Sequence, residues 1–189
     1  MKNSNLEVVR HSFANTVFTH KVQESAAERT HEYVFWVKFV NILMVALVLL
    51  SLSLQLAYLE QPIFSSIGIG LTIAEIIFLI IQLTFSYEAK EVSHKNAAIK
   101  YLGLRDRYKN FIADIMDEEI SKAELKAKRD AFQTEYQQIS DLAPQTCQKD
   151  YDKAQEKLNK KGVVKGEEYT WSDEEIDRFL PESLRLNNK

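Results

Sequence analysis

The sequence predicts an all-α membrane protein: a two-transmembrane helical hairpin whose second span continues into a long cytoplasmic helix that packs as a helical hairpin or bundle. Residues 39–59 and 63–87 are two apolar segments of membrane-spanning length with almost nothing between them. Beyond them, apolar residues recur every three or four positions, the period of an α-helix. The chain has only 5 glycines and 3 prolines and no alternating β-branched stretch, so no sheet is expected.

The first span, predicted over residues 33–59, contains a long uncharged segment, residues 39–59. This segment would form about 31 Å of helix, which matches a hydrocarbon core of roughly 30 Å. Tyr33, Phe35 and Trp36 precede it, where an interfacial aromatic belt is expected. A cleavable signal peptide is a poor alternative, because the segment is too long for its apolar region and lacks a small-residue cleavage site.

The second span, residues 63–87, carries Glu75 at its centre. An ionised carboxylate there costs about 2.5 to 3.5 kcal/mol on insertion scales, whereas the Ile, Leu and Phe residues together return roughly 4 to 7 kcal/mol. The segment should therefore insert. An extracytoplasmic loop, residues 60–62, joins the spans in a tight hairpin, and Pro62 suits the first turn of the returning helix.

The distribution of basic residues predicts the orientation in the membrane. The loop has no Lys or Arg, whereas basic residues precede the first span and follow the second: Lys21, Arg29, Lys38, Lys90, Lys95, Lys100, Arg105 and Arg107. By the positive-inside rule, both termini of this multi-pass protein face the cytoplasm.

Residues 1–32 predict an N-terminal cytoplasmic amphipathic helix that runs on into the first span. Its apolar residues are spaced by three or four: Leu6, Val9, Phe13, Val17 and Phe18. The helix could lie on the membrane surface or pack on the cytoplasmic module. Packing is favoured, because the helix has too few basic residues for an electrostatic anchor.

Residues 88–160 predict a cytoplasmic helical bundle. Nothing after Tyr87 predicts a break, so one helix of roughly 80 Å is expected from Ile63 to Met116. Its apolar seam follows the heptad spacing of a coiled coil: His94, Ala97, Tyr101, Leu104, Tyr108, Phe111 and Ile115. Ser121 with Glu124 forms a capping box that opens an antiparallel return helix, which ends before Pro144. The apolar positions of that helix are Leu125, Phe132, Tyr136, Ile139 and Leu142.

A further polar helix is expected over about residues 148–160. Residues 161–189 follow as a flexible connection, marked by Gly162 and Gly166, and a C-terminal acidic helix. Ser172 caps that helix and Pro181 stops it. Its acidic residues favour the helix dipole, so we interpret them as a solvated, capped turn.

Polar residues inside the spans recur on one face of each helix. This polar stripe comprises Thr72, Glu75, Gln82 and Ser86 of the second span with Asn41 and Gln55 of the first. Lipid-facing polar groups are costly, so the stripe should face protein or water. A separate small-residue packing face consists of Ser66, Gly70 and Ala74, which suits close helix contact.

Two helices are not expected to shelter both the polar stripe and the packing face, so we predict a homo-oligomer in the lipid bilayer. A ring of hairpins would bring copies of Glu75 around a common axis, as in the acidic rings of cation-selective pores. Alternatively, Glu75 is protonated or hydrogen-bonded to Gln55 or another span residue and holds the assembly together. A proton relay in a transporter is disfavoured, because two spans without an internal repeat are a poor transporter.

No feature of the sequence predicts catalysis. The chain has no phosphate-binding or nucleophile-elbow motif, and its histidines lack paired ligand spacing: His11, His20, His31 and His94. We therefore expect no enzyme, cofactor or metal site. Basic and acidic residues nearly balance after the spans, so no direct nucleic-acid partner is expected. The single cysteine, Cys147, excludes an intramolecular disulfide and is expected to be reduced and partly buried.

The chain resembles the SLATT family, the SMODS and SLOG-associating two-transmembrane effector domains of bacteria. The likeness rests on the adjoining spans, the short loop and the return helix, and on two runs of residues: His94-Lys95-Asn96-Ala97-Ala98-x-x-Tyr101-x-x-Leu104 and Ala143-Pro144-Gln145-Thr146 followed by Asp150-Tyr151-x-x-Ala154. It covers about residues 26–160, and the tail after Gly162 is not part of it.

The resemblance implies an inner-membrane effector of a bacterial antiphage system, which arrests growth or kills the cell by opening the membrane (abortive infection). It also implies a signalling partner: a nucleotide-generating sensor, a nucleotide-sensing SLOG domain or a reverse transcriptase. The family brings no catalytic residues. We therefore hypothesise a homo-oligomeric effector that forms or gates a pore. The alternative is a non-conducting membrane scaffold or adaptor that localises a cytoplasmic partner.

Overall fold

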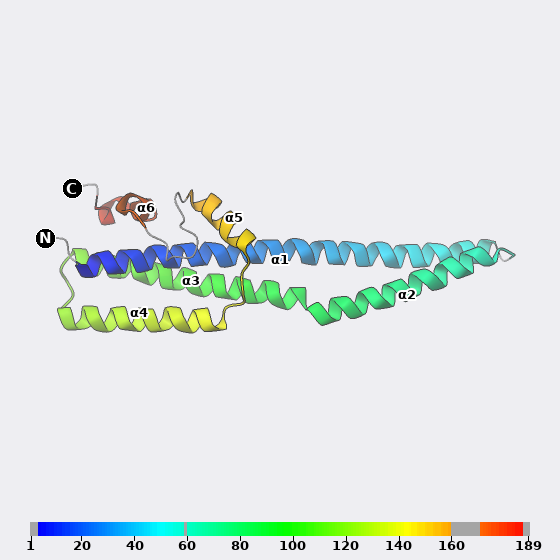
Figure 1. Ribbon diagram of the computed structural model, residues 1–189, viewed down its shortest axis with the longest axis horizontal. Helices are drawn as coiled ribbons and strands as arrows, with labels where there is room; N and C mark the ends of the chain where they lie inside the picture. Colours follow the sequence, from blue (N-terminus) through cyan, green and yellow to red (C-terminus); the bar gives the residue numbers. More distant parts are fainter. Residues whose placement is uncertain (1–3, 59, 160–170, 187–189) are drawn as a thin grey trace. The chain divides into compact units, whose positions relative to one another are not determined.

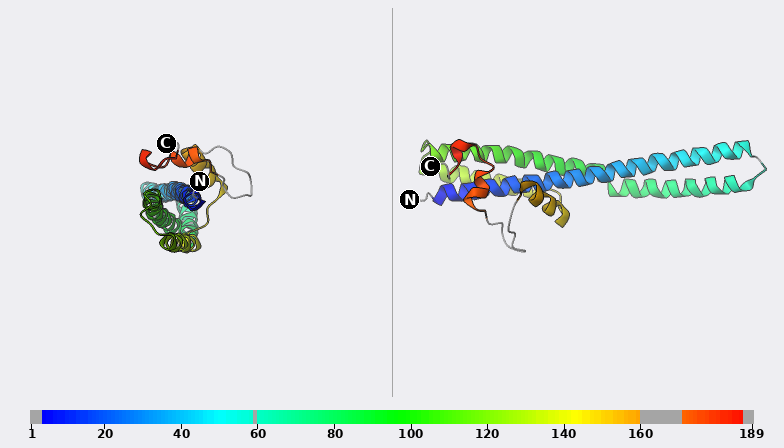
Figure 2. Two further views of the ribbon diagram at one scale, coloured as in Figure 1. Left: turned by 90° about the vertical axis from the view of Figure 1, so that its left-hand side faces the viewer. Right: turned by 90° about the horizontal axis from the view of Figure 1, so that it is seen from above.

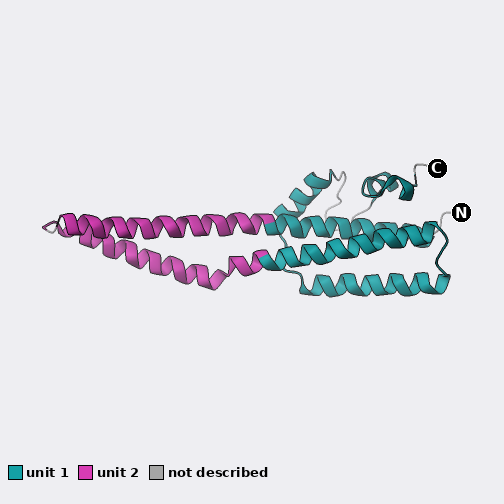
Figure 3. Ribbon diagram, turned by 180° about the vertical axis from the view of Figure 1, so that it is seen from behind, with its two compact units in different colours: residues 1–27, 92–189 teal, residues 28–91 magenta. Residues whose placement is uncertain are grey.

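A computed structural model describes residues 4–58, 60–159 and 171–186, and these contain helices, turns and irregular segments but no strand. The helices in chain order are α1 (Ser4–Ala57), α2 (Pro62–Phe85), α3 (Tyr87–Met116), α4 (Lys122–Leu142), α5 (Gln148–Leu158), α6 (Asp173–Asp177) and the 3-10 helix η1 (Glu182–Leu184), as Figure 1 shows. The predicted all-α fold class is confirmed. The chain divides into a bundle unit, residues 1–27 with 92–189, and a hairpin unit, residues 28–91 (Figure 3).

The hairpin unit pairs the C-terminal half of α1 with α2, and the two helices run antiparallel (Figure 2). Pro62 lies in the first turn of α2, where its missing N–H needs no partner. The most apolar windows of the two long helical stretches have mean hydropathies of 2.3 and 2.2, yet only 6% and 11% of their residues are buried. The core helix of a soluble protein would be buried, so this surface fits lipid, and both helices are membrane spans.

The expectation of one unbroken helix from Ile63 to Met116 is wrong at a single residue. Ser86 adopts the left-handed conformation, with φ 44° and ψ 46°, and separates α2 from α3. Hydrogen bonds from the Ser86 N–H to the Gln82 carbonyl (3.3 Å) and from the Lys90 N–H to the Ser86 carbonyl (3.2 Å) continue across the break. A left-handed serine costs about 1 to 2 kcal/mol, and neither glycine nor proline marks the position.

In the bundle unit, the N-terminal part of α1 packs into the core, as its spacing predicts. Val9, Phe13, Val17 and Phe18 are buried, and Leu6 packs against them. The seven residues of the seam on α3 are also buried, with Leu104 fully inaccessible. Side chains of α1 and α3 therefore form much of the core of this unit, to which α4, α5 and the C-terminal segment also contribute.

Helix α4 begins and ends where the sequence predicts. The side chain of Ser121 accepts a hydrogen bond from the Glu124 N–H, and Glu124 bonds back to the Ser121 N–H, which completes the capping box. The helix returns along α3: Tyr108 and Phe111 both meet Phe132, with ring centroids 5.1 and 5.5 Å apart. Leu142 is an exception to the predicted apolar face, because it is 76% exposed at the end of the helix.

Helix α5 follows after a short segment, close to the predicted range. Cys147 precedes it and is exposed, which corrects the prediction of a partly buried thiol. The predicted flexible connection at Gly162 and Gly166 lies outside the described residues.

The C-terminal segment, residues 171–186, is docked on α1, and this corrects the interpretation of its acidic helix as a solvated turn. Ser172 does cap α6 through a capping box with Glu175. However, Asp177 is buried, and its Oδ1 accepts a hydrogen bond from Arg10 Nη2 at 2.6 Å. Arg10 Nη1 also donates to the Leu184 carbonyl at 3.2 Å. The buried ion pair therefore joins the two ends of the described chain.

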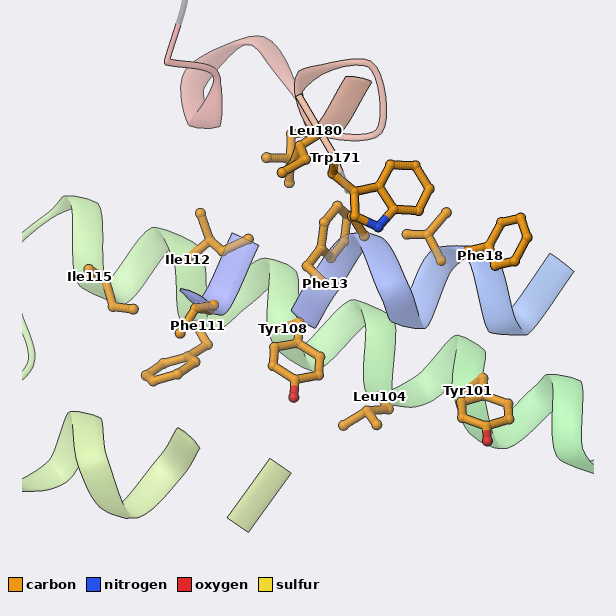
Figure 4. Packing of buried hydrophobic residues seen from close by; sticks show 14 of the residues in the cluster. Phe13, Phe18, Tyr101, Leu104, Tyr108, Phe111, Ile112, Ile115, Trp171 and Leu180 are labelled. Carbon is orange, nitrogen blue, oxygen red and sulfur yellow. The ribbon is translucent and has the colours of Figure 1, made fainter. Parts of the chain in front are cut away.

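Apolar contacts accompany this ion pair. Trp171 and Leu180 project from the C-terminal segment toward α1 (Figure 4), and both are buried in the same core as Phe13. The Trp171 indole N–H donates to Asn15 Oδ1 at 2.7 Å, and its ring meets Phe18 edge-on at 6.2 Å between centroids. Both polar and apolar contacts hold the segment in place.

We predict that Asp177→Ala releases the C-terminal segment. The substitution removes the nearer carboxylate partner of the fully buried Arg10 guanidinium and leaves Asp173, whose Oδ1 lies 3.9 Å from Arg10 Nη2, so the cost is at most about 3 to 5 kcal/mol. Fluorescence of Trp171, measured in a Trp36→Phe background, should shift to the red, and its thermal transition should move to lower temperature. The control is Glu174→Ala, an exposed acid in the same helix. Equal transitions in the two variants would contradict the prediction.

Candidate functional site: a polar row inside the hairpin

Three polar side chains lie inside the hairpin unit with oxygen atoms that have no partner. Glu75 is only 9% exposed, and Asn41 and Gln82 are half-buried. One oxygen of each is buried and has no hydrogen bond to the described residues: Asn41 Oδ1, Glu75 Oε2 and Gln82 Oε1. We call these three residues the polar row.

The register of the two helices places the row in the interior. On α2, Glu75 and Gln82 lie two helical turns apart, roughly 10 Å along the axis, and therefore on the same face. Gly68 extends this face toward the loop, where α1 comes so close that a Cβ added to Gly68 would lie 2.9 Å from Ser51 Oγ. This contact between two small residues sets how the helices pair.

Hydroxyl groups in the hairpin bond to their own helices and do not supply the row. Ser51 Oγ donates to the Val48 carbonyl at 2.8 Å, and Thr72 Oγ1 donates to the Gly68 carbonyl at 2.8 Å. A buried oxygen without a donor is costly, more so in lipid, where water is absent. The row therefore presents three buried acceptor oxygens that suit water, a proton or a cation, although the Asn41 and Gln82 amides also carry N–H donors.

A pocket of about 260 Å³ adjoins the row at the end of the spans nearest α3. Gln82 and Ser86 line it together with Lys38 and Glu88, whose Nζ and Oε1 atoms form an ion pair at 2.7 Å. The break at Ser86 thus lies in the wall of this pocket. Gln82 lines this pocket, and Glu75 lies two helical turns from Gln82 on the same face of α2. Polar side chains of one hairpin therefore follow each other from the pocket to Glu75.

The remaining residues of the predicted polar stripe and packing face lie elsewhere on the hairpin. Gln55 is half-buried, whereas Thr72 and Ser86 are exposed. All three residues of the packing face are exposed: Ser66, Gly70 and Ala74. A Cβ added to Gly70 would have no atom within 4 Å. The chain therefore leaves this face uncovered.

The hairpin shelters Glu75 but leaves the packing face exposed, so only the expectation that a helical pair cannot hide this carboxyl is wrong. The hairpin alone buries Glu75 to 9% exposure, so a single chain shelters this carboxyl from lipid. The physical reason is that α1 lies close against this face of α2, as the approach of Ser51 to Gly68 shows. No described group donates a hydrogen bond to Asn41 Oδ1, Glu75 Oε2 or Gln82 Oε1.

Reasoning from the sequence missed two features of this region. The contact between Ser51 and Gly68 was signalled only by two small residues at similar distances from the loop. The Lys38–Glu88 ion pair had no signal in the sequence, because its residues are far apart in the chain.

The predicted seam on α3 belongs to the bundle unit and is not part of the polar row. Among the described residues, no three His, Cys, Asp or Glu side chains are placed to hold a metal.

Comparison with known proteins identifies one match. A family model described as SMODS and SLOG-associating 2TM effector domain family 4 matches residues 6–175. No curated protein and no solved structure matches the chain.

We predict that Gly68→Ala loosens the hairpin, whereas Gly70→Ala does not. The new methyl group at Gly68 would press on Ser51 Oγ, and such overpacking costs about 1 to 3 kcal/mol. Unfolding of the purified protein in a detergent titration should therefore begin earlier for Gly68→Ala than for Gly70→Ala.

Adding Ser51→Ala to Gly68→Ala should restore the stability, since the remaining Ser51 Cβ lies at an ordinary 3.7 Å. If the two single variants unfold alike, Gly68 is not the point of close contact.

Proposed function

Because this chain belongs to the SMODS and SLOG-associating 2TM effector domain family, whose members are associated with defence systems, we propose that it is a homo-oligomeric pore-forming effector. In this proposal the protein lies in the bacterial inner membrane, with both termini in the cytoplasm. It forms or gates a pore when a partner sensor signals phage infection, and the open membrane arrests growth.

The observation that carries the proposal is the polar row. An anchor has no need of three buried acceptors, each of which costs free energy in lipid. A conducting path does need them, because oxygen atoms replace part of the hydration shell of a passing cation. Glu75 would supply the negative charge and the amide oxygens of Asn41 and Gln82 the neutral ligands. The pocket beside Gln82 would admit water from the end nearest α3.

Assembly in this proposal uses the exposed packing face of α2. Ser66, Gly70 and Ala74 allow a second helix backbone to approach closely, and the space around Gly70 is open. This face is separate from the interior of the hairpin. Copies could therefore associate while each keeps its own polar row.

The family description, with its SMODS and SLOG associations, fits a trigger from a nucleotide-signalling partner or a reverse transcriptase. The bundle unit is the part of the chain outside the spans and would receive that signal. The family is not known as one of enzymes, and we propose no catalytic step.

The alternative is a non-conducting scaffold that localises a cytoplasmic partner. The burial of Glu75 within one chain favours it, since a single hairpin already hides this carboxyl from lipid. Liposomes distinguish the two functions. A scaffold leaves vesicles sealed under every condition.

We predict that Glu75→Leu lowers cation leakage from proteoliposomes by about tenfold or more, because the row then lacks its only charged group. The neutral Glu75→Gln should fall between Glu75→Leu and the unsubstituted protein. Growth arrest after expression in bacteria should follow the same order.

The matched control for this experiment is Ile76→Leu, at a lipid-facing position that is 52% exposed. It should leak and arrest growth like the unsubstituted protein. Leakage and growth arrest that are unchanged in Glu75→Leu would count against a path along the polar row.

We also predict that Gly70→Leu reduces oligomerisation. A leucine there fits the free hairpin, because nothing lies within 4 Å, but it obstructs a close helix contact. Crosslinking in nanodiscs should give mainly monomer. Ala46→Leu, at an exposed position of the first span, is the control and should assemble normally. Normal assembly of Gly70→Leu would place the interface elsewhere.

A further inference from the structure

The bundle unit contains a pocket of about 430 Å³, which is within the range of small-molecule sites. Residues of α1, α3, α4 and α5 line it, together with Thr146 from the segment between α4 and α5. All of them belong to the bundle unit. The pocket is therefore separate from the polar row of the hairpin.

Among the described residues, the lining of this pocket carries no Lys, Arg, His, Asp or Glu. Phe18, Tyr108, Tyr136 and Tyr151 contribute aromatic surface, and the other side chains are mainly amides and hydroxyls. Burial raises the pKa of Tyr108 to about 12, so its hydroxyl stays neutral at any physiological pH. A phosphate or carboxylate inside the pocket would lose its hydration without gaining a cation as partner.

Hydrogen bonds fix much of the wall. Thr19 Oγ1 and the Tyr136 hydroxyl are 3.0 Å apart and join α1 to α4. Gln23 Oε1 lies 2.7 Å from His94 Nδ1, and Gln23 Nε2 donates to the Pro144 carbonyl at 3.3 Å. These contacts hold α1, α3 and the segment after α4 in one arrangement. A ligand would meet a largely preformed surface, which lowers the cost of binding.

Two side chains that line the pocket have polar groups available to bond a ligand. Gln133 and Thr146 form no side-chain hydrogen bond to another described residue. The Gln133 amide can donate and accept, and the Thr146 hydroxyl can do both as well. A ligand that matches this wall needs donors, acceptors and a flat apolar face.

From this lining we propose that the pocket binds an uncharged, planar small molecule that carries both hydrogen-bond donors and acceptors, such as a heteroaromatic amide or base. Its ring lies against the tyrosines and Phe18, and its polar edge bonds to Gln133 and Thr146. The proposal does not depend on pore formation. A charged substituent on such a ligand would have to project from the open side of the pocket.

Ligand-observed NMR with the full-length protein in nanodiscs tests the proposal. The probes are nicotinamide, its carboxylate analogue nicotinate, and adenine. Saturation transfer to nicotinamide and adenine should be clear at millimolar concentration, whereas nicotinate should show at least about fivefold less. This matched pair differs only in the charge and hydrogen bonding of one group.

Two variants test whether the saturation transfer comes from a ligand bound in this pocket. Gln133→Trp should abolish the transfer by filling the pocket, and Gln133→Ala should weaken binding about fivefold through loss of a hydrogen bond. Gln138→Ala, at an exposed position of the same helix that does not line the pocket, should bind like the unsubstituted protein. Absence of transfer to both neutral rings would overturn the proposal. So would equal transfer to nicotinate, or a signal that persists in Gln133→Trp.

Discussion

The scarcity of hydrogen-bond donors inside the membrane hairpin is the constraint on which the rest of this structure depends. In water an unpaired carboxyl or amide oxygen finds a solvent partner, but in hydrocarbon it does not. Glu75 is buried and Asn41 and Gln82 are half-buried in the hairpin, and each has a buried oxygen atom without a partner among the described residues. Shelter from lipid therefore does not by itself give these oxygen atoms a partner. We infer that the partner, a hydrogen-bond donor or a positive charge, comes from water, a proton or an ion.

The two units of the chain differ in how they pair buried charge, although Arg10 Nε and Ser25 Oγ of the bundle unit also have no hydrogen-bond partner among the described residues. In the bundle unit, Arg10 is fully buried and finds Asp177 at 2.6 Å and the Leu184 carbonyl at 3.2 Å. Buried charge there is paired and holds the C-terminal segment on α1. In the hairpin unit, the charged pair Lys38–Glu88 lies at one end of the spans, and three buried oxygen atoms of the interior have no hydrogen-bond partner among the described residues. A paired buried charge suits a unit that keeps one structure, whereas oxygen atoms without a partner suit a path for ions.

The pocket of the hairpin unit and the pocket of the bundle unit differ in the charge of their lining. The pocket beside Gln82 has an ion pair in its lining, whereas the larger one in the bundle unit has aromatic rings, amides and hydroxyls without any charge. An uncharged wall selects against anions and favours planar neutral groups. Helix α1 contributes residues to both units, and so does α3. The candidate ligand site and the polar row thus share helix α1.

The sequence by itself determined the features that depend on local chemistry. Apolar length defined the two spans, and Ser121 and Ser172 marked the starts of α4 and α6. Spacing identified seven of the nine buried residues of α3. These features follow from the helical period, from capping and from the cost of charge in lipid, each of which acts over a few residues.

Only the tertiary structure decided which distant groups meet. Arg10 pairs with Asp177 across almost the whole chain, Ser51 fixes the position of Gly68, and Ser86 breaks a helix without glycine or proline. The burial of Glu75 by a single hairpin likewise depends on how α1 lies against α2. Such contacts depend on the packing of whole helices, and local periodicity carries no information about the partner that a side chain meets.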